Sequence, residues 1–400
     1  MALLKINTMN KKIKLLFLTD ELEGNGNNRV MVNILNNISR DKFSFSLVLS
    51  ERRGIFLNDL REDVKITGLI KTEYLKDERF FPRVFRYVQR FYKVCKIINS
   101  EKPDIVLCPS YTLGLIAVFA KLFVRKTNII LLTQNHMSIV LEEECHNVND
   151  NFVGRIIVPK LLYRKVDEII CVSEGICDDL NKSFGIPKTK ITVIYNGCDR
   201  TEINKLKNEE IHDGWFKKTN LKIISVGRLH HQKGYEYLLK AFKLVTENEI
   251  NASLIILGEG IEKTNLEKLV RVLGIENYVI FAGFKENPYK YMKNSDVFVL
   301  SSIYEGFGYV IVEAMACGVP VIATRCPSGP DEIITDNVNG ILVPMKDENA
   351  LANAIIDLLI DKDKAERLMK EGIKRSNDFR VKKMVEEYER VFINLYKHKV

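Results

Sequence analysis

The chain has 400 residues, of which 46% are hydrophobic and 28% charged, and it carries a formal net charge of +8. This length and apolar content suffice for two sizeable cores, because single domains tend to split beyond about 250 residues. The eight cysteines include no close metal-type pair, which argues against a zinc site and against a disulfide framework.

The start of the chain carries no recognisable targeting signal. Residues 1–14 are polar and basic, and the apolar run at residues 15–18 is too short for the core of a signal peptide. The longest apolar stretch, residues 113–120, falls well short of the roughly 20 residues that a membrane-spanning helix needs. The sequence therefore predicts a protein that is made and kept in the cytoplasm.

Short apolar strands alternate with helical patterns in both halves of the chain. Near-continuous β-branched runs between helices are typical of parallel strands buried on both faces. The predicted strands span residues 13–19, 43–49, 104–108, 128–133, 168–172 and 192–195 in the first half, and residues 221–226, 253–257, 279–282, 297–301, 320–323 and 341–343 in the second. We expect an α/β protein with two facing Rossmann-like, doubly wound parallel-sheet domains, a cleft between them, and active groups at the carboxyl ends of the strands.

The domains are expected at residues 1–200 and 201–378, because the stretch 199–219 is polar, charged and weak in strand character. Apolar residues recur at helical spacing after residue 379. We therefore expect residues 379–400 to form a helix that packs back towards the N-terminal domain.

The positive charge lies wholly in the first 200 residues and concentrates between residues 79 and 96. Basic residues at spacings of three and four predict one basic helical face, with Val88 and Tyr92 among the apolar residues opposite. Two interpretations stay open, a solvated face and a surface that docks on anionic lipid headgroups. Nucleic acid is not expected as a partner, because no stacking motif or recognition helix accompanies the charge.

Three side chains follow predicted strands and are therefore site candidates. His136 lies at a strand's carboxyl end, where it could touch a bound ligand; a satisfied buried histidine is the alternative. Arg228 lies at the carboxyl end of the strand predicted at residues 221–226, and Lys233 lies on the following loop. A guanidinium holds phosphate in a bidentate manner and a lysine acts as a point charge, whereas the alternative is a solvated loop pair.

Glu305 and Glu313 enclose a glycine-flexed turn and an apolar run that together predict a strand, a loop and a short buried helix. Gly306 and Gly308 permit close backbone approach, and the free amides of a first helical turn bind anions such as phosphate. At a rise of about 1.5 Å per residue, Glu313 lies about two turns along the helix. The two carboxylates therefore cannot share one reacting bond.

The sequence Asp361-Lys362-Asp363 has the spelling of an Asp-x-Asp metal motif. It lies between helical stretches and follows no strand, so we interpret it as a helix cap or a solvated loop. We predict no metal, because Arg228, Lys233 and a helix terminus can supply the positive charge.

Several motifs occur in one order along the chain. In the second half they are residues 225–229, 232–234, 257–260, 281–284, 305–313, 317–323 and 328–333; in the first half they are residues 24–30, 172–174 and 196–199, together with His136. In this order they resemble the retaining glycosyltransferases with two facing Rossmann-like domains, the fourth sequence family of nucleotide-sugar transferases, of the GT-B type. The resemblance covers about the whole chain, unevenly, and implies donor binding by the second domain and acceptor binding by the first.

The resemblance also implies roles for single residues. Glu305 would contact hydroxyls of the donor sugar, and Glu313 would accept hydrogen bonds from the ribose. Arg228 and Lys233 would stabilise the charge that gathers on the leaving diphosphate. The catalytic candidates are Glu305, His136, Arg228 and Lys233, and the donor-binding candidates are Glu313, Gly306, Phe307, Gly308, Tyr309, Val310, Gly227, Gly258, Phe284 and Gly26.

The predicted function is that of a retaining, metal-independent hexosyltransferase without a cofactor. It would move a sugar from a nucleoside-diphosphate sugar, expected to be UDP-linked, to a glycan or lipid-linked oligosaccharide in cell-surface polysaccharide biosynthesis, such as that of lipopolysaccharide or capsule. The protein would be cytoplasmic, and peripheral on the membrane if the basic helix docks there. A nucleotide-sugar epimerase or phosphorylase of the same fold and a non-catalytic glycan-binding scaffold remain open.

Overall fold

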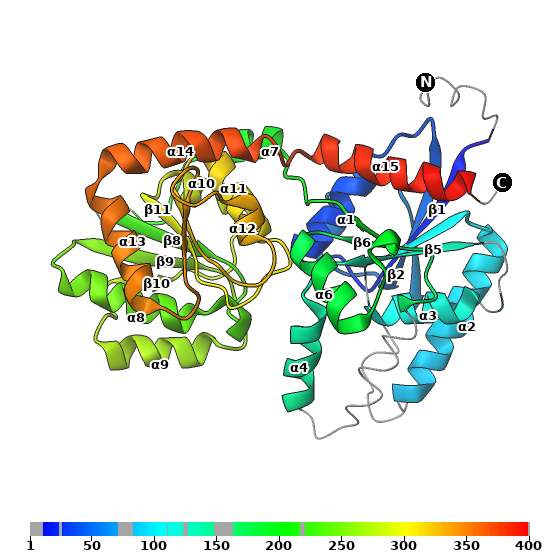
Figure 1. Ribbon diagram of the computed structural model, residues 1–400, viewed down its shortest axis with the longest axis horizontal. Coiled ribbons are helices and arrows are strands. Elements are labelled where there is room, and N and C mark those ends of the chain that lie inside the picture. Colours follow the sequence, from blue (N-terminus) through cyan, green and yellow to red (C-terminus); the bar gives the residue numbers. More distant parts are fainter. Residues whose placement is uncertain are drawn as a thin grey trace. The chain divides into compact units, whose positions relative to one another are not determined.

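The chain forms two compact units, each built around a parallel β-sheet (Figure 1). The computed structural model describes residues 11–23, 26–70, 83–109, 111–121, 123, 127–147, 163–216 and 221–398. Unit 1 comprises Met1–Val172, Ile176–Tyr195 and Val381–Val400, and unit 2 comprises Ser173–Gly175 and Asn196–Arg380. Residue 200, the predicted end of the first domain, is the first residue of α7 (Arg200–Leu206) in unit 2.

Within the described residues, the sheet of unit 1 has seven strands, all parallel, in the order β3-β2-β1-β4-β5-β6-β7. They are β1 (Ile13–Thr19), β2 (Phe43–Glu51), β3 (Lys65–Ile70), β4 (Ile105–Cys108), β5 (Asn128–Thr133), β6 (Glu168–Cys171) and β7 (Ile191–Val193). All four residues of the inner strand β4 are buried. Burial on both faces explains why the inner strands read as unbroken apolar runs.

Strand β3 was not predicted from the sequence. It lies at the edge of the sheet and pairs only with β2 within the described residues. It begins with a lysine and contains Gly68, both of which weaken a strand pattern. An edge strand is covered less than an inner one, so its sequence needs no apolar run.

The sheet of unit 2 has six parallel strands in the described residues, in the order β10-β9-β8-β11-β12-β13. They are β8 (Leu221–Val226), β9 (Ala252–Leu257), β10 (Val279–Phe281), β11 (Val297–Leu300), β12 (Val321–Thr324) and β13 (Ile341–Val343). The chain reverses its direction of travel across the sheet between β8 and β11. In open α/β sheets, ligands bind outside the carboxyl ends of the strands at this switch point.

Helices flank both sheets (Figure 1). Those whose residues lie wholly or mostly in unit 1 are α1 (Gly26–Asn37), η2 (Ile55–Leu57), α2 (Arg83–Glu101), α3 (Tyr111–Lys121), α4 (Met137–Asn147), α6 (Glu174–Phe184), η4 (Lys188–Lys190) and α15 (Val381–Lys397). In unit 2, α7 is followed by η5 (His231–Lys233), α8 (Tyr235–Glu247), α9 (Lys263–Leu273), α10 (Tyr289–Lys293), α11 (Tyr309–Cys317), α12 (Pro330–Ile333), α13 (Glu348–Ile360) and α14 (Lys362–Ser376). A core cluster in unit 2 joins β8 and β9 to α8 and α13, with Phe242 and Ile355 fully buried.

The C-terminal helix α15 returns to unit 1. The Glu389 carboxylate accepts a hydrogen bond from the Ser39 amide at 2.8 Å, and the rings of Phe392 and Phe43 meet edge to face at 6.0 Å. Phe392 and Phe43 are both buried. This last helix is therefore part of the core of unit 1, although all of unit 2 precedes it in the sequence.

The predicted arrangement of the basic helix is wrong at several positions. Val88 and Tyr92, expected to pack inwards, are 58% and 66% exposed on α2. Arg90 lies 4.0 Å from Glu51, and the Lys93 ammonium donates to the carbonyl of Leu69. The ends of β2 and β3 offer these acceptors, and long aliphatic stems let basic side chains reach them along an apolar surface.

Residues 79–82, the start of the predicted basic segment, lie outside the described residues. In the part of the chain that the structure describes, no helix is both long enough and apolar enough to cross a membrane.

Candidate functional site

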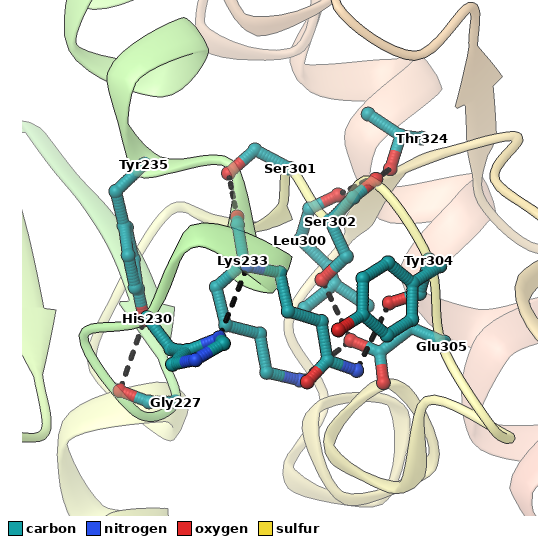
Figure 2. Close-up of polar contacts among 11 residues, drawn as sticks. Gly227, His230, Lys233, Tyr235, Leu300, Ser301, Ser302, Tyr304, Glu305 and Thr324 are labelled. Carbon is teal, nitrogen blue, oxygen red and sulfur yellow. Dashed lines mark hydrogen bonds and ion pairs between the residues drawn. The ribbon is translucent and has the colours of Figure 1, made fainter. Parts of the chain in front are cut away.

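The polar cluster in Figure 2 lies where β8 and β11, neighbours in the sheet of unit 2, come to their carboxyl ends. Lys233 closes the 3-10 turn η5 after β8, and Glu305 lies on the loop after β11. Lys233 Nζ and Glu305 Oε1 are 2.5 Å apart, with side chains 15% and 8% exposed. Two residues predicted for the site therefore form a mostly buried ion pair.

Ser302 donates a second hydrogen bond to the same oxygen, Glu305 Oε1, at 2.6 Å. Ser302 is fully buried, and its own carbonyl accepts a hydrogen bond from Thr324 at the end of β12. Among the described residues, no donor reaches the other carboxylate oxygen, Oε2. Both of these hydrogen bonds therefore meet at one oxygen of Glu305, Oε1.

The loop that carries Lys233 is fixed to the segment after β11. The Ser301 hydroxyl donates to the Lys233 carbonyl at 2.8 Å, and the side-chain amide of Gln232 donates to the Tyr304 carbonyl at 3.1 Å. Gly234 has a φ of 59°, and a Cβ there would lie 2.2 Å from the Ser301 carbonyl oxygen. Only glycine allows this approach, which holds the lysine beside Glu305.

Helix α11 begins four residues after Glu305. Gly308, in the left-handed conformation, precedes its first residues, Tyr309 and Val310, which are half-buried. The Tyr309 hydroxyl donates to the Gly197 carbonyl at 3.2 Å. The Ile311 amide donates to the Gly308 carbonyl at 2.8 Å, whereas the amides of the first two helical residues have no intrahelical acceptor, so this end of the nine-residue helix can bind an anion. Gly306 and Phe307, also predicted for the site, are buried in the loop between.

Glu313 lies further along α11 and is half-buried. The Tyr289 hydroxyl, on α10, donates to Glu313 Oε1 at 2.8 Å. Burial and, to a smaller extent, the Glu313 charge raise the pKa of the Cys198 thiol to about 12. Glu313 is therefore partly desolvated and held by Tyr289, while its predicted role apart from the Lys233–Glu305 pair remains a prediction.

The turns after β8 and β9 lie directly against each other. Gly258 has a φ of 142°, and a Cβ there would lie 2.0 Å from the Gly227 carbonyl oxygen. That carbonyl also accepts a hydrogen bond at 3.1 Å from the phenol of Tyr235, whose pKa is raised by burial. Arg228, which follows β8, is exposed, and Phe284, which follows β10, is 48% exposed. These two side chains lie at the same edge of the sheet as the polar cluster but form none of its hydrogen bonds or ion pairs among the described residues.

His136 lies in unit 1, directly before α4 and after β5. Its Nδ1 is 3.4 Å from Oδ2 of Asp179, whose side chain is 1% exposed. The same Asp179 oxygen accepts a hydrogen bond from the Ser138 amide at 3.0 Å. The hydrogen-bond partner of Nδ1 is the Ser138 hydroxyl, at 3.2 Å, so Ser138 and Asp179 both lie on the Nδ1 side of the ring. Gly26, the other candidate of this unit, is the exposed first residue of α1.

The approach of His136 and Gly26 to the candidates of unit 2 remains a prediction. Gly24 and Asn25, which belong to the same glycine-rich motif, lie outside the described residues.

Buried cysteines near the site are unsuited to nucleophilic catalysis. Cys326 is 3% exposed, and burial, assisted by the Glu305 charge, raises the pKa of its thiol far above neutrality. Because the thiolate is the nucleophilic form, this cysteine is inert at neutral pH.

The Asp361 motif is a helix cap, as predicted. The Asp361 side chain accepts a hydrogen bond from the Lys364 amide at 2.9 Å, at the start of α14. Across the ranges that the structure describes, no three His, Cys, Asp or Glu side chains gather closely enough to hold a metal ion. Metal independence itself remains a prediction.

Three residues of these networks were missed from the sequence: Ser302, Tyr289 and Asp179. Ser302 had a signal, because it directly follows the strand predicted at residues 297–301 and lies three residues before Glu305. Tyr289 and Asp179 had none, because their partners are distant in the sequence and only packing brings them together.

Two family models match adjoining parts of the chain. They are Glycosyltransferase Family 4, over residues 24–202, and Glycosyl transferases group 1, over residues 207–375.

Two curated proteins with similar sequences are named as glycosyltransferases. Over 286 residues the chain is 31% identical to the N-acetylgalactosamine-N,N'-diacetylbacillosaminyl-diphospho-undecaprenol 4-alpha-N-acetylgalactosaminyltransferase of Campylobacter jejuni, which covers 71% of this chain and 74% of that one. Over 337 residues it is 28% identical to an uncharacterized glycosyltransferase of Methanocaldococcus jannaschii, which covers 76% of this chain and 82% of that one.

Among solved structures, Anabaena Alr3699/HepE in complex with UDP-glucose is similar with a TM-score of 0.77 at 22% identity, over 96% of this chain and 100% of that one. Identity at this level supports the fold alone. Together with the two parallel sheets, it confirms the predicted pair of Rossmann-like domains of the GT-B type.

Proposed function

The chain belongs to the GT-B glycosyltransferases, and from that premise we propose that it is a retaining enzyme that transfers a sugar from a UDP-sugar to a lipid-linked oligosaccharide or another glycan. The observation that carries the proposal is the Lys233–Glu305 pair at the switch point of the unit 2 sheet, followed directly by the first turn of α11. A cation, free amides and a carboxylate at one sheet edge match the parts of a nucleotide-sugar donor.

The division of roles follows from the charges that develop during transfer. When the bond between C1 and the phosphate oxygen breaks, negative charge gathers on the diphosphate and C1 becomes oxocarbenium-like. Lys233, Arg228 and the α11 amides stabilise the diphosphate. Glu305 Oε2 accepts hydrogen bonds from the donor sugar, and Glu313, held by Tyr289, accepts them from the ribose. No metal is needed for this charge balance.

Retention of the anomeric configuration follows from attack on the same face of the sugar. The acceptor oxygen bonds to C1 on the face that the diphosphate leaves, and its proton passes to the leaving phosphate oxygen. No protein nucleophile is required for this route. Two observations favour it: Glu305 is engaged by Lys233 and Ser302, and the Cys326 thiol stays protonated at neutral pH.

The donor and acceptor classes are proposed from the relatives. The Anabaena neighbour is named as a complex with UDP-glucose, and the Campylobacter relative is named for transferring N-acetylgalactosamine to a diphospho-undecaprenol-linked sugar with an alpha linkage. We therefore propose UDP-glucose and UDP-N-acetylgalactosamine as the first donors to test, and polyprenyl-diphosphate-linked sugars as the first acceptors. Such acceptors place the enzyme in cell-surface polysaccharide assembly.

The test is a screen of UDP-sugars for release of UDP together with a new glycosidic bond. Lys233→Ala and Glu305→Ala should each lower transfer by about 100-fold or more, since each removes a group that meets developing charge or the sugar. The matched controls are Lys243→Ala and Glu247→Ala, which break a 3.3 Å ion pair on α8 outside the site. Near wild-type transfer by folded Lys233 and Glu305 variants would contradict the residue roles, and free sugar without a new bond would contradict transfer.

We also propose that unit 1 docks on anionic membranes through α2 and α3, which pack together. Val88 and Tyr92 on α2 and Phe119 on α3 are exposed at 58%, 66% and 46%, and Phe123, two residues after the end of α3, is exposed at 73%. The rings of Phe91 and Phe123 meet at 5.9 Å, and the basic side chain of Lys96 is exposed nearby on α2. Apolar side chains that insert beside cations are the features by which interfacial helices bind anionic lipid.

Flotation with vesicles of phosphatidylglycerol and phosphatidylcholine tests this surface. Tyr92→Asp and Phe123→Asp should release the protein from the vesicles. Val272→Asp, at a position 82% exposed on α9 of unit 2, should not. Equal binding by all three variants would contradict docking through α2 and α3.

A further inference from the structure

The contacts of Glu305 Oε1 distinguish two kinds of partner. Lys233 Nζ, at 2.5 Å, is charged and comes from the loop after β8. Ser302 Oγ, at 2.6 Å, is neutral and lies three residues before the glutamate that it contacts. Figure 2 shows both side chains directed to the same carboxylate. Glu305 Oε1 thus has one charged partner, which a nearby anion attracts, and one neutral partner, which a nearby anion attracts far less.

A bound diphosphate changes these partners unequally. It is a second anion beside Lys233, and an ammonium has three N–H donors that it can redistribute between a carboxylate and a phosphate. The hydroxyl of Ser302 carries no charge and, being fully buried, gains little from a change of partner. The lysine contact is therefore the one that a donor weakens.

Ser302 is itself held on both sides. It is the second residue after β11 (Val297–Leu300), and its carbonyl accepts a hydrogen bond from Thr324, the last residue of the neighbouring strand β12. The adjacent Ser301 hydroxyl donates to the Lys233 carbonyl at 2.8 Å. A hydroxyl on so fixed a backbone can hold a carboxylate without reorganisation.

We propose that Ser302 is a positioning residue, whose hydroxyl holds Glu305 in place while Lys233 turns its charge to the diphosphate of the donor. This assignment rests on the proposed function of the same site. With Oε1 retained by Ser302, Oε2 stays directed to the sugar as the diphosphate leaves. The two donors to one oxygen then have separate duties: Lys233 stabilises the leaving group and Ser302 keeps the sugar-binding carboxylate fixed.

The experiment compares Ser302→Ala with Ser376→Ala. Ser376 is also fully buried in unit 2, and its hydroxyl donates to the Ile373 carbonyl at 2.8 Å, so both variants lose one buried hydroxyl. The turnover number and KM are measured with the UDP-sugar that the wild-type protein uses fastest, and the affinity for UDP by calorimetry. Folding of unit 2 is followed by the fluorescence of Trp215, the single tryptophan of the chain.

Ser302→Ala should lower the turnover number by about tenfold to a hundredfold, the loss expected for one hydrogen bond to a charged group. Its affinity for UDP, which lacks the sugar, should equal that of the wild type. Lys233→Ala should instead weaken UDP binding, and Ser376→Ala should change neither quantity. This split between turnover and UDP affinity is what a merely structural serine would not produce.

Wild-type turnover in Ser302→Ala, or a loss of UDP affinity as large as the loss of turnover, would overturn the assignment. If the alanine variant does not fold, Ser302→Cys replaces it, because a thiol has similar size and is a weak donor. A folded cysteine variant with wild-type turnover would then overturn it. A wild-type protein that neither binds UDP nor consumes any UDP-sugar would overturn the proposed function, and this assignment with it.

Discussion

Replacing Gly234 with alanine is expected to damage unit 2 far more than the same replacement at Gly274. Both glycines are left-handed, with φ of 59° and 66°. A Cβ at Gly234 would lie 2.2 Å from the Ser301 carbonyl oxygen, whereas a Cβ at Gly274 would meet nothing within 4 Å. The two variants therefore share the cost of an unfavourable backbone conformation and differ only in the clash.

The size of the difference can be worked out from these contacts. A left-handed alanine costs about 1–2 kcal/mol at either position. At Gly234 the carbonyl must also move by about 1 Å to reach an ordinary contact distance, and overpacking of a closely packed site adds about 1–3 kcal/mol. With a urea dependence of roughly 2 kcal/mol per M, the extra cost lowers the unfolding midpoint by about 1 M relative to Gly274→Ala.

Urea unfolding followed by Trp215 fluorescence measures this for unit 2 alone, because the chain has one tryptophan. Its indole is stacked on Tyr291 at 5.8 Å, so the signal changes when this unit unfolds. Gly234→Ala should also lower donor turnover, since Ser301 and Lys233 move with the loop. Equal midpoints for the two alanine variants would refute the claim that close approach to Ser301 requires glycine.

Three further predictions concern single side chains. Tyr289→Phe removes the 2.8 Å donor to Glu313, so the affinity for UDP should fall by about tenfold in calorimetry, and an unchanged affinity would argue against a ribose contact at Glu313. Burial raises the pKa of Cys198 to about 12 and that of Cys326 further, so at pH 8 both thiols stay protonated. They should react with a thiol reagent far more slowly than free cysteine does, and faster labelling in the native protein would contradict their burial. Asp361→Ala removes the cap of α14 and should cost about 1 kcal/mol in urea unfolding without changing donor turnover, whereas a large loss of turnover would favour a metal role.

The strands that the sequence predicts best are those buried on both faces. The predicted limits of β1 and β8 agree with the structure, because each is an apolar run between polar turns. Strand β3, which was missed, lies at an edge and contains Gly68. The prediction of which face of the basic helix is exposed was wrong for a related reason. Helical spacing predicts two faces, but whether Arg90 and Lys93 contact water or protein acceptors depends on the ends of β2 and β3.

The candidate site was predicted in part. Lys233 and Glu305 were identified in separate motifs, and in the structure they form an ion pair between Nζ and Oε1. Arg228, predicted with Lys233, is exposed and makes no ion pair among the described residues. A sequence motif predicts which residues lie at the carboxyl end of a strand, but the direction of each side chain depends on the turn that follows.

The sequence by itself determined the two α/β units, the carboxylate spacing of Glu305 and Glu313, and the glycines that its turns require. These follow from local chemistry: apolar runs make buried strands, and eight positions along a loop and helix fix a separation. Only the tertiary structure decided which side chains contact each other, such as Ser302 and Lys233 with Glu305, or Tyr289 with Glu313. The physical reason is that strand order, which no local pattern encodes, sets which loops meet at the sheet edge.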